Sequence, residues 1–296
     1  MYMYSKFDSA YFAVEKSQTQ RPQDRSYAWA DKVSNTFFVS YISGVSSDGK
    51  TSYYEFASYK DLPAFLTAYS NIAAKDRCFN ETIRDGRECV EYYDIDWKLD
   101  TSWEGKNVAE LEQCVFAEFL EARNQFAPEY PVTEEMCRVL TSSSGSKVSL
   151  HILIPKYVFE NNNEHMKAFM DNSKEARGSD EVTNLTKYID PAVYIKNRGI
   201  RILGSCKRSS PDRILQKAEW HSASKNTKDE EFYITNVSDE STRVAPVESV
   251  KSKRKRADRS ASSEESEQVQ VREDSKLPQS VVDSVQDTFR KYKHAG

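Results

Sequence analysis

Side chains that can bind metal ions and phosphates are concentrated in three short segments of this chain. The segments are E-Y-Y-D-I-D-W at 91–97, K-V-S-L-H-I-L-I-P at 147–155 and Y-I-D-P-A-V-Y-I-K-N-R-G-I-R-I-L-G-S-C-K at 188–207. Together they supply three carboxylates suited to divalent metal ions, and several Lys, Arg, His and Ser side chains suited to phosphate oxygens. This combination predicts a nucleotidyl-transfer site.

The first segment is typical of a β-strand with two aspartates on one face. Side chains alternate along a strand, so Asp94 and Asp96 point the same way, about 7 Å apart. Two carboxylates at that spacing can converge on a pair of divalent ions, and all-oxygen ligation favours Mg²⁺ or Mn²⁺ over zinc. A surface strand edge with two solvated aspartates has the same D-x-D pattern, so this motif alone leaves both interpretations open.

The other two segments supply the cations. Lys147, Ser149 and His151 alternate with apolar residues, so one strand face presents an ammonium, a hydroxyl and an imidazole to the oxygens of a triphosphate. In the third segment, Asp190 can complete the metal site while the basic residues after it neutralise phosphate charge. A half-exposed strand and a surface basic hairpin are the alternatives, but the presence of all three motifs in one chain favours the site.

Composition narrows the class of protein. The chain has 296 residues, 38% of them hydrophobic, and a formal net charge of −4, which argues against coating nucleic acid through bulk charge. No hydrophobic run approaches the roughly 18–20 residues of a membrane span, so we expect no membrane partner. The five cysteines are scattered, without a C-x-x-C pair, which predicts an intracellular protein with reduced thiols.

Hydrophobic periodicity predicts the elements that position these segments. We expect helices at Asp61–Ala73, with Asp61 as the N-cap, at Val108–Phe126, and over the polar stretch 160–187. We expect strands at Thr36–Ile42, Glu88–Trp97, Cys137–Thr141, Lys147–Pro155, Ile200–Leu203 and Glu231–Ile234.

A change in composition near Asn236 divides the chain. We expect a catalytic core at 1–235, a disordered charged linker at 236–280, and an amphipathic helix at 281–296 that opens a further domain or binds a partner. The run K-S-K-R-K-R at 251–256 resembles a nuclear localisation signal, with a solvated basic stretch as the alternative. A nuclear location, or a viral replication compartment, is therefore expected.

The three motifs, in this order, resemble those of the archaeo-eukaryotic primase superfamily. The similarity is to its branch of eukaryotic primase-polymerases and of primases from herpesviruses and other large DNA viruses. The shared pattern is an acidic pair on a strand, then S-x-H, then an Asp followed by arginines and a lysine. The stretch V-Y-I-K-N-R-G-I-R at 193–201 is particularly similar to primase-polymerases, and the resemblance covers roughly residues 30–210.

The resemblance implies an α+β fold, in which an N-terminal α/β module packs on an RRM-like module with the active site in the cleft. Asp94, Asp96 and Asp190 would hold two Mg²⁺ or Mn²⁺ ions. Tyr59 would lie near the sugar, and Arg21 or Arg25 would touch the template. The triphosphate would be bound by Lys147, Ser149, His151, Arg198, Arg201 and Lys207.

By the same resemblance the protein would be a DNA primase, a primer-extending polymerase, or both. Its partners would be single-stranded DNA template and primer, ribo- or deoxyribonucleoside triphosphates, and a helicase or single-strand-binding protein. Many relatives carry a zinc-binding module after the core, and these 296 residues show no motif for one, so by the resemblance we expect efficient extension and poor initiation. The rivals are a catalytically degenerate nucleic-acid-binding subunit of the same fold, and a D-x-D glycosyltransferase.

Overall fold

The computed structural model describes residues 31, 34, 36–46, 52–98, 107–175 and 189–246. These residues belong to one compact unit that runs to Val247, and they form a mixed α+β structure with two largely antiparallel sheets. The expected linker beyond 246, the basic run at 251–256 and the expected helix at 281–296 lie outside the described residues. Within the described part, no helix has both the length and the apolar character needed to cross a membrane.

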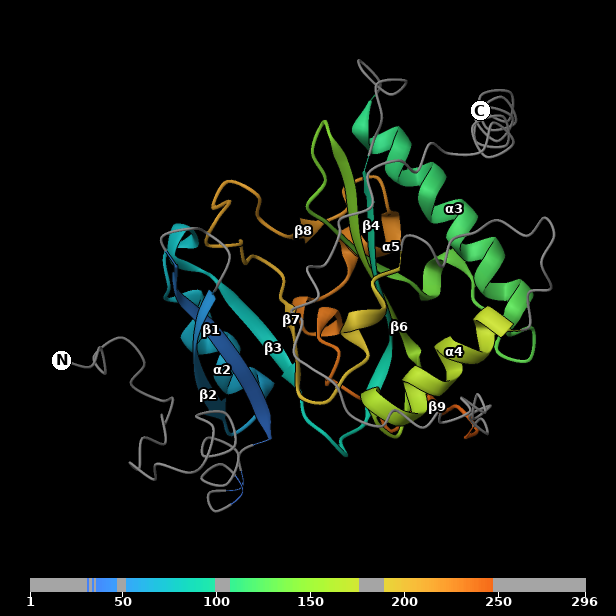
Figure 1. Cartoon of the computed structure of the whole chain (residues 1–296), viewed down its shortest axis with the longest axis horizontal. Coiled ribbons are helices and arrows are strands. Elements are labelled where there is room, and N and C mark those ends of the chain that lie inside the picture. The colour runs from blue at the N-terminus through green and yellow to red at the C-terminus, as the bar shows by residue number, and fades with distance from the viewer. Residues whose placement is uncertain are drawn as a thin grey trace, which may run out of the picture. The chain divides into compact units, whose positions relative to one another are not determined.

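The first sheet has four strands in the order β2-β1-β3-β7 (Figure 1). They are β1 (Phe37–Val45), β2 (Ser52–Tyr59), β3 (Phe79–Ile83) and β7 (Arg198–Arg201). The helix α2 (Leu62–Ser70) follows β2, and the Asp61 side chain accepts a hydrogen bond from the Ala64 N–H at 2.9 Å. The predicted N-cap is therefore confirmed.

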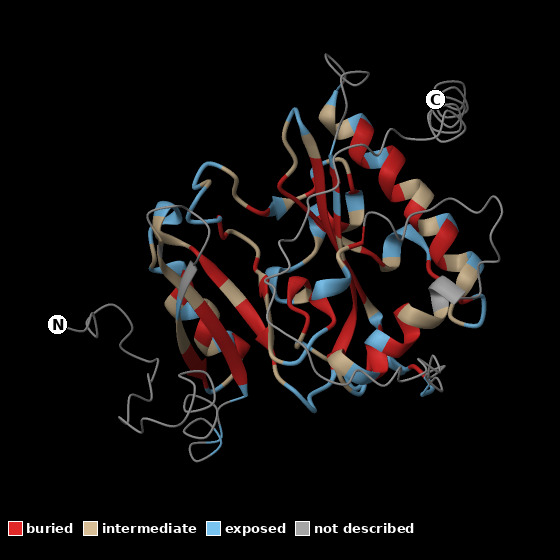
Figure 2. Ribbon diagram, in the orientation of Figure 1, coloured by how far each residue is buried: buried red, intermediate tan, exposed pale blue. Residues whose placement is uncertain are grey.

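The core of this unit begins on one face of the first sheet. Alternate residues of its strands, including Phe37, Val39 and Phe79, pack with α2 around Phe65, whose side chain is fully buried. Figure 2 shows the buried residues running along these strands. Helix α2 covers one face of this sheet, and residues of the opposite face, such as Ser40 and Asn80, line a cavity.

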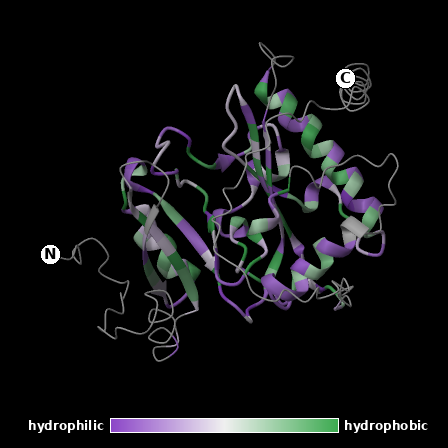
Figure 3. Ribbon diagram, viewed as in Figure 1, coloured by the Kyte–Doolittle hydropathy of each residue, from purple (hydrophilic) through white to green (hydrophobic). Residues whose placement is uncertain are grey.

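The second sheet has the order β4-β6-β5-β8, and a short strand β9 adds to β6 in parallel. Its helix, α3, occupies Val108–Phe126 as predicted and buries Leu111, Val115 and Phe119, while hydrophobic and hydrophilic bands alternate along it (Figure 3). The strands are β4 (Cys89–Lys98), β5 (Arg138–Thr141), β6 (Lys147–Phe159), β8 (Gln216–Lys217) and β9 (Thr242–Arg243). Since β9 belongs to the sheet, ordered structure continues past residue 235, where we expected the linker to begin.

Shorter elements lie between the strands. A π-helix at Asn162–Met166 leads into α4 (Lys167–Glu175), which covers part of the expected 160–187 helix, and residues 176–188 are outside the described residues. A small helix, α5, occupies Ser222–Asn226. Single-turn 3-10 helices lie at Ala74–Asp76, Glu134–Met136, Pro191–Val193 and Asp229–Phe232.

The strand predicted at Glu231–Ile234 is wrong. The segment ends a 3-10 helix and then wraps around a buried carboxylate, because Glu81 accepts hydrogen bonds from the Ile234 and Thr235 N–H groups at 2.8 Å. Its apolar residues are buried one after another, not in alternation, with Tyr233 packed against Phe37. A run of apolar residues could not distinguish this loop from a strand.

Candidate active site

The first two motifs lie on paired strands. In the β4–β6 register, Asp94 is directly opposite His151 and Asp96 is directly opposite Ser149. Directly opposed residues share a face of the sheet, so the two carboxylates, the imidazole and the hydroxyl all point the same way. The polar faces predicted for the two strands therefore form one continuous surface of the sheet.

Asp96 is held by two of the predicted phosphate-binding residues. Its carboxylate accepts a hydrogen bond from Ser149 Oγ at 2.9 Å and forms an ion pair with Lys147 Nζ at 2.6 Å. Burial acts to raise the pKa of Asp96, but the hydrogen bonds from Lys147 and Ser149 outweigh it, so the pKa lies below its ordinary value. Asp96 is therefore ionised at neutral pH, as a metal ligand must be.

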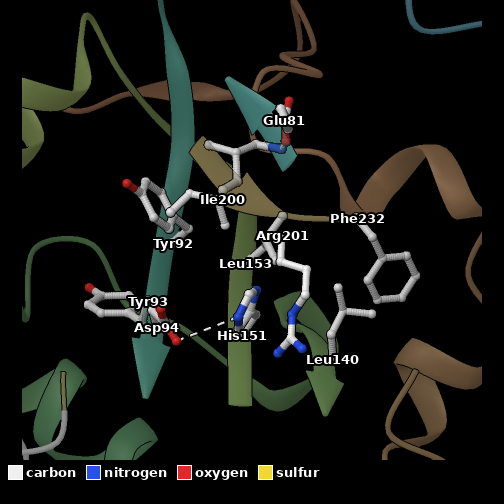
Figure 4. Close-up of a pocket in the computed structure, with 11 residues that line it drawn as sticks. Glu81, Tyr92, Tyr93, Asp94, Leu140, His151, Leu153, Ile200, Arg201 and Phe232 are labelled. Atoms are coloured by element: carbon white, nitrogen blue, oxygen red, sulfur yellow. Dashed lines mark hydrogen bonds and ion pairs between the residues drawn. The ribbon is translucent and has the colours of Figure 1, made fainter. Parts of the chain in front are cut away.

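Asp94 faces the imidazole of His151. Their closest atoms, Oδ1 and Nε2, are 3.5 Å apart, and Figure 4 shows the Arg201 guanidinium beside the imidazole ring. Burial lowers the pKa of His151, Asp94 opposes that shift, and Arg201 and Lys207 add to it. A His151 ring with a lowered pKa is mostly neutral at pH 7, and it can then donate to a phosphate oxygen through one nitrogen.

The third motif reaches the same place through the backbone. Ile189 forms an isolated antiparallel bridge with Ile95, and the Asp190 N–H donates to the Asp94 carbonyl at 2.9 Å. The Asp190 side chain caps the short helix at Pro191–Val193, and Arg198 lies 3.9 Å from it. Asp190 is thus brought next to the acidic pair by contacts that the sequence spacing does not reveal.

The two arginines of β7 retain unused hydrogen-bonding capacity. Arg201 donates to Ser142 Oγ at 2.6 Å and to the Arg213 carbonyl at 3.2 Å. The Nε atoms of both Arg198 and Arg201 are buried without a hydrogen-bond partner. Buried unpaired donors are costly, so each one requires an explanation, such as a functional role or a bound water or ion. Burial lowers the pKa of Arg201, and it lowers the pKa of Lys207 as well, with Arg201 and Lys147 adding to the second shift.

Ser142 and Arg213 were missed by the sequence-based prediction. Arg213 donates to the Ser142 carbonyl through Nη2 at 2.6 Å, and Ser142 Oγ contacts Ser149 Oγ at 3.3 Å. These two residues therefore tie Arg201 to the strand that carries Ser149. Both lie in loops, where residue spacing predicts no common face, and the only available signal was the serine-rich turn before β6.

Most of the predicted site residues line one cavity of about 640 Å³. Its lining includes polar and charged groups from both sheets, together with residues of β1, β2 and β3. Lys147 is not among the lining residues, but its ammonium pairs with Asp96, which is. The predicted residues that line the cavity are Asp94, Asp96, Ser149, His151, Asp190, Arg198, Arg201 and Lys207.

Tyr59, by contrast, lies in the core of the first sheet. Its side chain is 1% exposed and packs edge-on against Phe65, with the ring centroids 5.2 Å apart. Burial raises the pKa of Tyr59 to about 12. The structure thus gives this residue a packing position outside the cavity lining. Arg21 and Arg25, the expected template contacts, lie outside the described residues.

The carboxylates fit divalent ions that bind together with a nucleotide. Among the described residues, no three Asp, Glu, His or Cys side chains form a ready-made metal site. Asp94, Asp96 and Asp190 nevertheless line one cavity and offer oxygen ligands only. Because Mg²⁺ is usually held by one or two carboxylates plus substrate phosphates and water, a closed protein cage is not required.

No protein-family model matches the chain, and the search of curated proteins finds no match. The activity of the chain must therefore be inferred from its motifs and from the contacts described above.

Proposed function

We propose that this protein catalyses template-directed nucleotidyl transfer on single-stranded DNA, as a primase, a primer-extending polymerase or both. The motif resemblance further favours the catalytic fold of the archaeo-eukaryotic primases. The observation that carries the proposal is the cavity lining: eight residues predicted from three separate segments face one space of about 640 Å³. A cavity of this size can hold a nucleoside triphosphate.

Each group has a role that follows from its chemistry. Asp94, Asp96 and Asp190 would hold two Mg²⁺ or Mn²⁺ ions, which when bound lower the pKa of the attacking hydroxyl and stabilise the pyrophosphate leaving group. His151 would donate a hydrogen bond to a phosphate oxygen, and Ser149 would do the same once its single O–H turns away from Asp96. The cations would offset the negative charge that develops on the phosphates, and the unpaired Nε atoms of Arg198 and Arg201 suit this role.

Lys147 has a second role in this scheme. Its ion pair keeps Asp96 ionised and correctly placed before substrate arrives. An incoming triphosphate offers the ammonium an alternative partner, so Lys147 can move from Asp96 to a phosphate oxygen. That exchange would leave an Asp96 oxygen available to hold a divalent ion.

The test is a pair of assays on one single-stranded DNA template with Mg²⁺ or Mn²⁺, one primed and one unprimed, using ribo- and deoxyribonucleoside triphosphates in parallel. We expect extension of the primer, new primers on the unprimed template, or both, and complete loss of product when a chelator is added. Asp94→Ala should abolish synthesis without affecting folding, whereas Asp171→Asn, on α4 outside the cavity lining, should leave it unchanged.

Other outcomes would replace the proposal. Synthesis by a contaminant-free Asp94→Ala protein would contradict the assignment of the metal ligands. Turnover of a labelled nucleotide sugar in place of a nucleoside triphosphate would indicate the D-x-D glycosyltransferase. Template binding with neither extension nor initiation would indicate a catalytically degenerate subunit.

A further inference from the structure

The face of the first sheet that lies opposite α2 forms one wall of the cavity. The registers place Ser40 opposite Phe56 and Ile42 opposite Tyr54, and they place Asn80 beside Ser40 on β3. These residues therefore share one face with Thr82, two positions after Asn80. All six line the cavity, and we call this surface the platform: Ser40, Ile42, Tyr54, Phe56, Asn80 and Thr82.

The platform is uncharged, unlike the rest of the cavity. Among the described residues, the two exposed large hydrophobic side chains, Tyr54 (48%) and Ile195 (46%), both line this cavity. The Tyr54 and Phe56 rings are stacked, with centroids 6.5 Å apart and planes 27° apart. Flat aromatic surface left open beside ionic groups matches a ligand with a planar apolar part and a phosphate-bearing part.

Two details at the other end of the platform also indicate a ligand. The Thr82 hydroxyl is buried, with the residue 2% exposed, and has no hydrogen-bond partner. Gly199 lies opposite Thr82 on β7 and adds no side chain to this surface. A Cβ at this position would lie 3.3 Å from both the Asn80 Cβ and the Ser40 Oγ. A bound group can come close to a surface without side chains, and its polar edge can form a hydrogen bond with the Thr82 hydroxyl.

We propose that the platform binds bases of the single-stranded template, with Tyr54 and Phe56 as the stacking residues; this rests on the function proposed above. The choice of template over incoming nucleotide follows from the strand order. The aromatic pair lies on β2 at one edge of the sheet, and Arg198 and Arg201 lie on β7 at the other. Three strand spacings, about 14 Å, separate them. A nucleotide anchored by its phosphates near β7 thus has its pairing partner toward β2.

The experiment measures equilibrium binding to the full chain without nucleotide or divalent metal. The probes are a fluorescent oligothymidylate and an abasic strand of equal length, which keeps the phosphates and removes the bases. We expect wild type to prefer the oligothymidylate. Tyr54→Ala and Phe56→Ala should each reduce that preference by about ten-fold, the effect of losing one stacked base, and leave abasic binding unchanged.

The matched control is Glu55→Gln, on the same strand between the two aromatic residues and facing the opposite side of the sheet. This variant should keep the base preference. Equal affinity of wild type for the two strands, or an aromatic variant with unchanged preference, would overturn the platform proposal. So would variants that leave oligothymidylate affinity intact and raise only the KM for the nucleoside triphosphate, because the platform would then hold the incoming base.

The two proposals can fail separately. Base-dependent binding without any nucleotide transfer would leave the platform standing and refute the catalytic proposal. Nucleotide transfer without base-dependent binding would refute the platform and leave catalysis intact.

Discussion

Strand β4 carries charged residues on both of its faces, and each face contributes to a different cluster. The two clusters differ in how many of their charged and hydrogen-bonding groups have a partner. Glu91 on one face pairs with Arg123 of α3, and both side chains are completely buried. Asp94 and Asp96 on the other face line the cavity, with side chains 20% and 39% exposed. The same type of residue on the same strand therefore occupies two different environments.

The Glu91–Arg123 pair is closed. Arg123 binds both carboxylate oxygens, with Nη2 at 2.9 Å, and its Nη1 donates to the carbonyls of Ala127 and Tyr130. The Tyr93 hydroxyl also donates to Glu91, at 2.6 Å. Both charged partners are thus satisfied within the fold, and the pair has no capacity to bind a ligand.

The cavity cluster is open. Within the described part of the chain, the Asp94 carboxylate has one polar contact, at 3.5 Å to His151, and the Nε atoms of Arg198 and Arg201 have no hydrogen-bond partner. Incomplete pairing of charges around a solvent-accessible space leaves groups available to a ligand, whereas complete pairing away from solvent leaves none. The comparison shows that charge alone does not mark a functional residue.

The largest effect is expected for activity when the open cluster is changed. Asp96→Asn should reduce nucleotide transfer about a thousand-fold, because it removes ligand charge worth several kcal/mol in the transition state. The free energy of unfolding should change by less than about 1 kcal/mol, since the carboxylate is more than one-third exposed. Steady-state kinetics and urea denaturation measure the two. A loss of stability that parallels the loss of activity would contradict this contrast.

The closed pair should show the reverse. Arg123→Met leaves Glu91 buried without a partner and should lower the free energy of unfolding by about 3–5 kcal/mol. The double variant Glu91→Leu with Arg123→Met should recover much of that loss. Activity per folded molecule should stay near wild type in the double variant. A double variant that is no more stable than Arg123→Met would show that the ion pair is not the source of the destabilisation.

A pH effect on stability should come from His221, far from the acidic cluster in sequence. Burial lowers the pKa of His221 to about 4 from 6.5, and its Nδ1 accepts the Ser224 N–H at 3.1 Å. Because the folded state disfavours protonation, this contribution is present above pH 6.5 and is lost as pH falls toward 4. The loss should reach about 3 kcal/mol.

His221→Asn keeps a capping acceptor and removes the titration. Denaturation curves at several pH values should therefore show a flatter profile for the variant between pH 6.5 and 4. An identical slope for the two proteins would show that other groups dominate acid unfolding.

The smallest effect is expected for Tyr59→Phe. Its side chain packs in the core of the first sheet and does not line the cavity, so the KM for nucleoside triphosphate should change less than about two-fold, equivalent to about 0.4 kcal/mol. Kinetics with the same primed template test this. A large increase in KM would place Tyr59 near the sugar after all, as the family resemblance implies.

Much of the local structure was predictable from sequence. Helix α3 has the predicted bounds, Asp61 caps α2, and the strands that carry the first two motifs lie where alternation predicted them. Predictions from the sequence were less accurate where tertiary contacts decide the conformation. The conformation of the segment at Glu231–Ile234 depends on hydrogen bonds to the buried Glu81 carboxylate. Arg213 donates to the Ser142 carbonyl, which lies in a loop distant from it in sequence.

The sequence by itself determined which side chains share a face within one strand, because the two-residue period of a β-strand is a local property. It therefore paired Asp94 with Asp96, and Ser149 with His151. Only the tertiary structure decided that these two pairs are directly opposed and that Asp190 joins Asp94. The tertiary structure also decided that the Tyr59 side chain lies on the face of the first sheet that packs against α2. Strand register, bridges and burial depend on residues far apart in the chain, and no local pattern contains them.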